Sequence, residues 1–85
     1  MRFVDLKVWA DQGCALGREA ESGRLYMSIP VSNRQADYEE YYEIDQDAFE
    51  RFSKDAEAAA AFAGRCRRHE LDHLLIVPPG RDRGA

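Results

Sequence analysis

Three residues near the end of the chain have the types and the spacing of a catalytic metal site. They lie in the segment HELDH, residues 69–73, which fits the pattern H-E-x-x-H. On a helix this pattern places two histidines on one face to bind zinc, and the glutamate beside them serves as a general base. In this chain the two ligands would be His69 and His73, and the base would be Glu70. The chemistry indicated is metal-assisted hydrolysis.

A catalytic zinc takes three protein ligands and keeps one open position, so the segment needs a further ligand. Either cysteine of the chain, Cys14 or Cys66, is a candidate. With Leu74 added, the segment reads HELDHL, which resembles the third motif of peptide deformylases. That family also takes a cysteine ligand from an upstream Gly-Cys pair, and Gly13 precedes Cys14 here. The resemblance implies Cys14, His69 and His73 as metal ligands, with Glu70 as the acid and base.

The resemblance is confined to these six residues and the Gly-Cys pair. The family's glycine-rich motif near the N-terminus is missing, Cys14 is followed by ALG, and the chain is shorter than the family's members. The elements predicted on either side of the segment also argue against a continuous zinc-binding helix. Leu74 begins the apolar run LLIV, closed by Pro78 and Pro79, which predicts a buried strand. The preceding helix must then end near residues 68–72, so the two histidine rings would not converge.

The pattern elsewhere predicts a small α+β fold. Alternation of apolar and polar residues predicts strands over residues 3–9, 25–31 and 38–44, and the Gly- and Ser-containing stretch 10–23 predicts a loop. Asp45 or Asp47 can cap a helix that the alanine-rich stretch continues to residue 68, with a possible break at residues 53–55. We therefore expect a three-stranded antiparallel meander, this helix, and a fourth strand over residues 74–77. The layout is β-β-β-α-β in two layers, with sheet order 3-2-1-4.

The size and charge of the chain narrow the classes of function. Its 85 residues predict one domain over residues 1–79 and a flexible tail over residues 80–85. Twelve Lys and Arg against sixteen Asp and Glu leave a net charge of −4, which weighs against a general nucleic-acid binder. Two cysteines, no signal-peptide pattern and no long apolar run predict a cytoplasmic protein outside the membrane.

The most acidic part of the chain is also its most tyrosine-rich. Seven acids lie between residues 37 and 50, and three tyrosines interleave with them. Tyrosine is enriched at interface hot spots, and acids at the rim steer a basic partner. The predicted partner-binding residues are Tyr38, Glu39, Glu40, Tyr41 and Glu43. The other interpretation is a solvated strand face running into a helix N-terminus, where acids favour the helix dipole.

We predict a small protein-binding domain that needs no cofactor and whose partner is a protein, basic in character. In size, charge and layout the chain is similar to small bacterial immunity proteins, which implies an inhibitor of the immunity or antitoxin type. The metal-dependent hydrolase is the first alternative, and the second is an RNA-binding accessory domain. The arginines of that second alternative are Arg65, Arg67, Arg68, Arg81 and Arg83.

Overall fold

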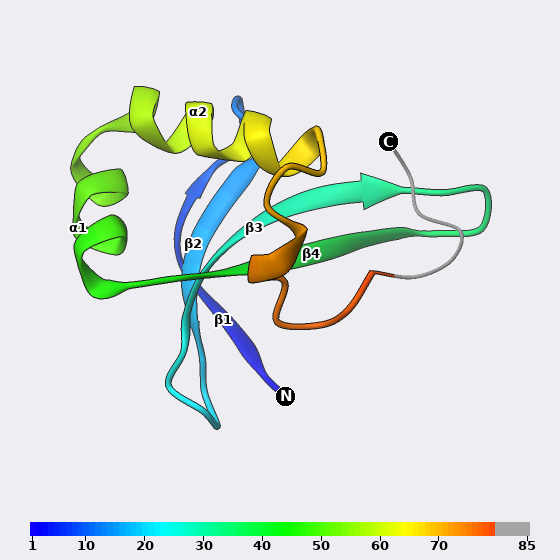
Figure 1. The fold of residues 1–85 in the computed structure, drawn as a ribbon, viewed down its shortest axis with the longest axis horizontal. Helices are drawn as coiled ribbons and strands as arrows, with labels where there is room; N and C mark the ends of the chain where they lie inside the picture. The colour runs from blue at the N-terminus through cyan, green and yellow to red at the C-terminus, as the bar shows by residue number, and fades with distance from the viewer. Residues whose placement is uncertain (80–85) are drawn as a thin grey trace.

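The computed structural model describes residues 1–79, which form an antiparallel sheet of four strands followed by two helices (Figure 1). The elements are β1 Phe3–Trp9, β2 Cys14–Glu19, β3 Leu25–Ser32, β4 Asp37–Ile44, α1 Gln46–Lys54, α2 Ala56–Arg67 and the 3₁₀ helix η1 Asp72–Leu74. The strands lie side by side in chain order, β1-β2-β3-β4. The chain is therefore a small α+β fold, and the predicted tail, residues 80–85, lies outside the described residues.

The predicted sheet is wrong in which segments form its strands and in their order. The three expected strands correspond to β1, β3 and β4, but the stretch expected as a loop contains β2. This strand pairs antiparallel with β1 on one side and with β3 on the other. Its glycines explain the error. Gly13 has φ of +62° in the β1–β2 turn, as a turn glycine does, whereas Gly17 lies within the strand.

The predicted last strand, residues 74–77, is also wrong. The chain does not cross back to lie beside β1. After α2 it turns through η1 and touches the outer edge of β4 at a single antiparallel bridge between Leu75 and Tyr42. Pro78 and Pro79 then follow, and proline has no N–H with which to extend a ladder. The described layout is therefore β-β-β-β-α-α.

The helices begin where acidic side chains cap them. The Asp45 carboxylate accepts the Ala48 N–H at 2.8 Å, and the Asp55 carboxylate accepts the Ala58 N–H at 3.1 Å. Asp55 is the C-cap of α1 and the N-cap of α2, so the helix breaks within the stretch 53–55. Neither helix of the described residues combines the length and apolar character that crossing a membrane requires.

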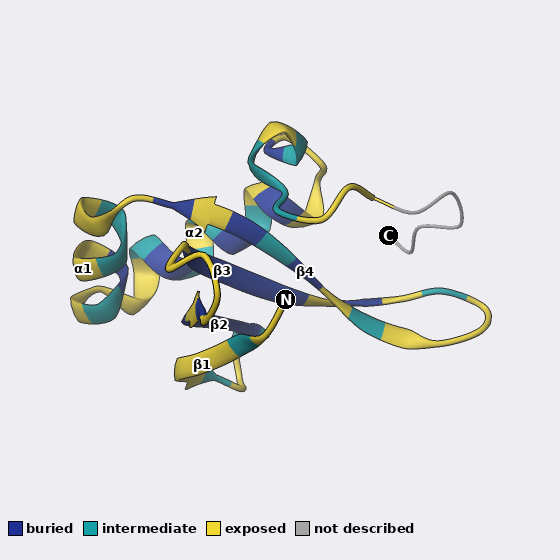
Figure 2. Cartoon of the chain, turned by 90° about the horizontal axis from the view of Figure 1, so that it is seen from below, coloured by how far each residue is buried: buried dark blue, intermediate teal, exposed yellow. Residues whose placement is uncertain are grey.

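One face of the sheet packs against the helices and forms the core. The register aligns Leu16, Met27 and Tyr42 across β2, β3 and β4, and all three are fully buried. Against them α2 places Ala59, Ala63 and Cys66 at a spacing of three and four residues, which is one helix face. Alanine is small enough to let the helix lie close to the strands. Figure 2 shows this division, with buried residues along β3 and exposed residues on the outer sides of the helices.

The opposite face of the sheet, here called the open face, is covered by no helix of residues 1–79. Its residues include Phe3, Gly17, Tyr26 and Tyr41, which alternate with the core residues along each strand. The rings of Phe3 and Tyr41 stack with centroids 3.6 Å apart, although their strands are the two outermost of the sheet. In a flat sheet these strands would be about 14 Å apart, three spacings of roughly 4.8 Å. The sheet therefore curls, and the open face is concave.

Candidate functional site

The HELDH segment does not form one helical turn. Helix α2 ends at Arg67, and His69 follows it with φ of +62°, a left-handed conformation. His73 lies in η1, beyond the turn. Both histidines are exposed. The chain thus reverses between the two rings, which removes the shared helix face that a zinc helix needs.

The remaining candidates of the metal hypothesis lie in other environments. Cys14 and Cys66 are buried free thiols, and burial raises the pKa of both, that of Cys66 to about 12. The Glu70 carboxylate is bound by Arg68 at 2.7 Å and by Arg65 at 3.3 Å, and these contacts lower its pKa. A general base is more effective with a pKa raised toward neutrality. Over residues 1–79, no three His, Cys, Asp or Glu side chains gather in a group that could hold a metal ion.

The arginines of the RNA alternative that fall in the described residues make contacts within the chain. Arg65 and Arg68 bind Glu70, and Arg67 donates to the carbonyl oxygens of Gln12 and Gly13 in the β1–β2 turn. These contacts join the C-terminal end of α2 to neighbouring segments. Arg81 and Arg83 lie outside the described residues.

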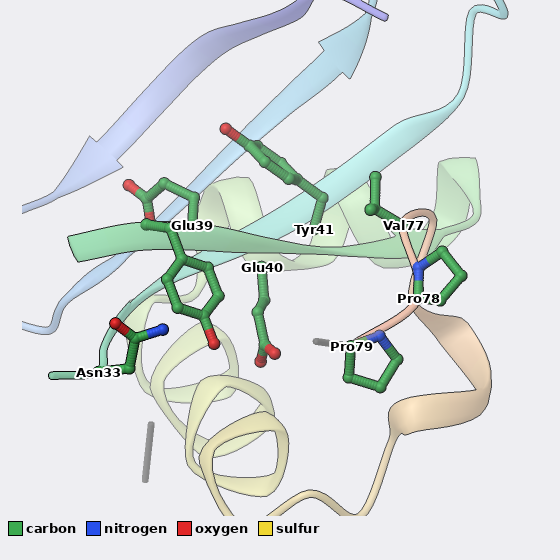
Figure 3. A pocket seen from close by; sticks show the side chains of 8 residues that line it. Asn33, Glu39, Glu40, Tyr41, Val77, Pro78 and Pro79 are labelled. Atoms are coloured by element: carbon green, nitrogen blue, oxygen red, sulfur yellow. The ribbon is translucent and has the colours of Figure 1, made fainter. Parts of the chain in front are cut away.

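The predicted partner-binding residues lie on β4, an outer strand of the sheet. Strand alternation divides them: Tyr38 and Glu40 belong to the helix-covered face, and Glu39, Tyr41 and Glu43 to the open face. Figure 3 shows Glu39 and Tyr41 projecting from β4 on the side opposite Glu40. The five residues therefore do not share one face of the sheet.

Four of the five nevertheless line one groove, here called the β4 groove, of about 490 Å³ (Figure 3). Its lining residues are Asn33, Tyr38, Glu39, Glu40, Tyr41, Val77, Pro78 and Pro79. The exception is Glu43, which lies in a separate hollow with His73, Leu74 and Leu75. The Leu75 bridge to Tyr42 stands between the two hollows.

The C-terminal segment forms the second wall of the β4 groove, and sequence reasoning did not place it there. The Ile76 N–H donates to the Tyr41 carbonyl at 2.9 Å, which anchors this segment to the outer edge of β4. The prolines that follow lead the chain away from the strand. Backbone groups alternate in direction along an antiparallel strand, so the N–H and C=O of Glu39 face the same outer edge as those of Tyr41.

The two carboxylates of the groove differ in their surroundings. Glu40 is buried, and its carboxylate accepts the Tyr42 hydroxyl at 2.8 Å. The same hydroxyl lies 3.3 Å from the carbonyl oxygen of Cys66 in α2, so this pair links β4 to the helix. Glu39 is exposed on the open face. Partial desolvation, and then the nearby charge of Asp5, raise the pKa of Glu39.

An aromatic cluster on the open face holds Asp5 near Glu39. The Tyr26 ring is fully buried there, edge-on to both Phe3 and Tyr41, with centroids 5.4 and 5.0 Å away. Its hydroxyl donates to Asp5 at 2.6 Å, and burial together with this bond raises the pKa of Tyr26. Sequence reasoning missed this cluster. The available signal was Gly17, a glycine inside a strand, which often marks close approach by another group.

No protein-family model matches the chain, and searches of curated proteins and of solved structures give no significant match.

Proposed function

We propose that the protein binds a protein partner through the β4 groove, and that the partner contributes a basic segment. The observation that carries this proposal is the β4 groove itself. Four of the five residues that the sequence predicts as partner-binding line this groove of about 490 Å³. Under this proposal the protein acts as an inhibitor of the immunity or antitoxin type, covering a basic surface of its partner.

The chemistry of the groove supports a peptide-like ligand. Tyrosines such as Tyr38 and Tyr41 offer large contact areas with a polar tip, and the prolines at 78 and 79 offer a rigid apolar wall. The outward backbone groups of Glu39 lie at the edge of the sheet, where an extended segment can pair with them as an added strand. The carboxylates then favour lysine or arginine in that segment. A net charge of −4 would speed its approach.

Charge reversal on β4 tests the proposal with a control from the same strand. Glu39→Lys introduces a cation into the β4 groove and should weaken a complex recovered by co-purification at least tenfold. Glu43→Lys makes the same charge change four residues along the strand, outside the groove. Glu40 is left unchanged, because its bond to the Tyr42 hydroxyl makes its reversal a test of folding.

The proposal requires the two variants to differ. A complex weakened by Glu39→Lys and retained by Glu43→Lys supports it, and loss of binding in Tyr38→Ala strengthens it. Equal weakening by both reversals would mean that only net charge matters. An unaffected complex in all three variants would overturn the proposal.

A further inference from the structure

A second cavity lies on the open face, near the end of the sheet where β1 turns into β2. Its volume is about 200 Å³. All four strands contribute to its walls, among them Asp5 and Val8 of β1, Ala15 of β2, Ser28 and Pro30 of β3, and Glu39 of β4. Because the sheet curls, residues from its two outermost strands, Asp5 and Glu39, border the same small space.

Three polar side chains that line this cavity, those of Asp5, Ser28 and Glu39, can accept hydrogen bonds. Asp5 and Glu39 bring two carboxylates. The Tyr26 hydroxyl binds Asp5 and holds that side chain in place. No ion pair within residues 1–79 involves Asp5 or Glu39; the acids paired there are Glu21, Glu43 and Glu70. Two like charges therefore face each other without a cation from the described part of the chain.

The Ser28 hydroxyl is a separate indication of a ligand. Ser28 is only 3% exposed, and strand alternation directs its side chain to the open face, where it lines the cavity. Among the described residues this hydroxyl makes no hydrogen bond, and its oxygen is not fully enclosed by protein atoms, so a ligand in the cavity can reach it. A ligand that donates hydrogen bonds would satisfy both the hydroxyl and the carboxylates.

We propose that this cavity binds one organic cation, an ammonium or guanidinium group, between Asp5 and Glu39 with Ser28 as a further acceptor. Val8, Ala15 and Pro30 supply apolar walls suited to the carbon chain that carries such a group. A metal ion fits less well, since no group of three His, Cys, Asp or Glu exists over residues 1–79. The two carboxylates lie close enough to interact, since partial desolvation and then the Asp5 charge raise the pKa of Glu39.

The cavity does not depend on the function proposed for the β4 groove, although Glu39 borders both. Variants separate the two sites. Asp5 and Ser28 line only the cavity, and Tyr38 lines only the groove. Asp5→Asn removes the charge and keeps an oxygen that can accept the Tyr26 hydroxyl, so the aromatic cluster retains its hydrogen bond.

The test is a titration of the isotope-labelled full chain followed by amide chemical shifts, at constant ionic strength. Methylguanidinium and butylammonium are the probes, and urea is the neutral control of similar shape. We expect saturable shifts at residues 5, 28 and 39 with both cations and none with urea. Asp5→Asn and Glu39→Gln should each weaken binding about tenfold, as loss of a charge-assisted hydrogen bond does. Ser28→Ala should weaken it less, and Glu43→Gln and Tyr38→Ala should leave it unchanged.

A blocked arginine dipeptide distinguishes the source of the cation. Binding as tight as that of methylguanidinium indicates a site for a side chain of a protein, and weaker binding indicates a site for a small free amine. Both results support a cation site. Shifts with urea that match those with methylguanidinium, shifts that do not saturate, or an affinity unchanged by both Asp5→Asn and Glu39→Gln would overturn the proposal.

Discussion

The two faces of the sheet bury aromatic and apolar side chains by different means. On the helix-covered face, Leu16 and Met27 pack against α1 and α2, which supply separate layers of side chains. On the open face, Tyr26 is equally buried, yet the groups that cover it come from the sheet itself. Phe3 and Tyr41 reach across from the two outermost strands and meet above it.

This difference assigns stability mainly to the helix-covered face, whereas the cation site proposed above lies at the margin of the open face. The helix-covered face is closed by an apolar layer where α1 and α2 lie on it. The open face is closed only at its centre, by the aromatic cluster, and its margin carries Asp5 and Glu39 beside a cavity. Curling of the sheet therefore buries tyrosine and brings carboxylates from distant strands together.

The largest expected loss of stability comes from the helix-covered face. Leu16→Ala leaves a cavity under α2 and should lower the free energy of unfolding by about 2–5 kcal/mol. Leu6→Ala is the matched change on β1, where the side chain is 59% exposed, and should change it by less than about 0.5 kcal/mol. Chemical denaturation measures both. Similar losses in the two variants would contradict the assignment of the core.

Gly17→Ala tests how closely the open face is packed. A Cβ at this position would collide with the Val4 carbonyl oxygen and the Tyr26 phenol. We expect a loss of about 1–3 kcal/mol in the free energy of unfolding, as for overpacking. Gly64→Ala is the control, because its Cβ meets only the flexible end of Arg68 at 3.4 Å and alanine favours a helix by about 0.5–1 kcal/mol. We expect the free energy of unfolding to fall in Gly17→Ala and to rise in Gly64→Ala. Stabilisation by both changes would show that Tyr26 does not lie over Gly17.

The contact between the outermost strands can be measured as a coupling energy. In a double-mutant cycle of Phe3→Leu and Tyr41→Leu, we expect a coupling of about 0.5–1.5 kcal/mol, typical of an aromatic pair. The pair Phe3 and Phe62, on different faces of the molecule, should be additive within about 0.5 kcal/mol. Additivity of Phe3 with Tyr41 would mean that the sheet does not curl enough to bring its outermost strands together.

A smaller effect on stability, which depends on pH, is expected from Glu19 at the end of β2. Hydrogen bonds from the Ser22 side chain, then from the N–H groups of Glu21, Arg2 and Ser22, lower the pKa of Glu19 from 4.5 to about 2. Since the folded state favours the charged form, this stabilisation is complete above about pH 4.5 and is lost as the pH falls toward 2.

Glu19→Gln should therefore be less stable than the wild type at pH 7, and the difference should shrink between pH 4.5 and 2. Thermal unfolding across this range measures it. Glu50→Gln, an exposed acid on α1, controls for the general loss of a charge. A difference that stays constant down to pH 2 would show that the carboxylate does not receive these hydrogen bonds.

Local patterns predicted the elements whose residues interact mainly with near neighbours. Alternation located β1, β3 and β4, and Asp45 and Asp55 cap helices as their side chains favour. Strand β2 escaped detection because Gly17 is a poor strand former by itself. Gly17 is needed because the Tyr26 ring lies against it and leaves no space for a side chain, and this contact exists only in the folded sheet.

Residues 74–77 also could not be predicted correctly from their local pattern alone. Residues 74–77 have the composition of a buried strand, but the turn at His69 and the prolines decide their path, and only Leu75 pairs with β4. For the candidate site, the acidic and tyrosine-rich composition predicted a set of partner-binding residues, four of which line the β4 groove: Tyr38, Glu39, Glu40 and Tyr41. The second wall, and the approach of Asp5 to Glu39, depend on contacts between distant segments and could not be predicted from local patterns.

The central claim is that cationic ligands bind at β4 because of its geometry rather than because the whole protein is acidic. A map of amide chemical shifts during titration with a blocked pentapeptide of alternating valine and lysine tests it most directly. We expect saturable shifts concentrated at residues 37–41 and at Ile76 and Val77, with the helix acids Glu50 and Glu57 unaffected. Shifts spread evenly over all acidic residues, or absent from β4, would contradict the claim.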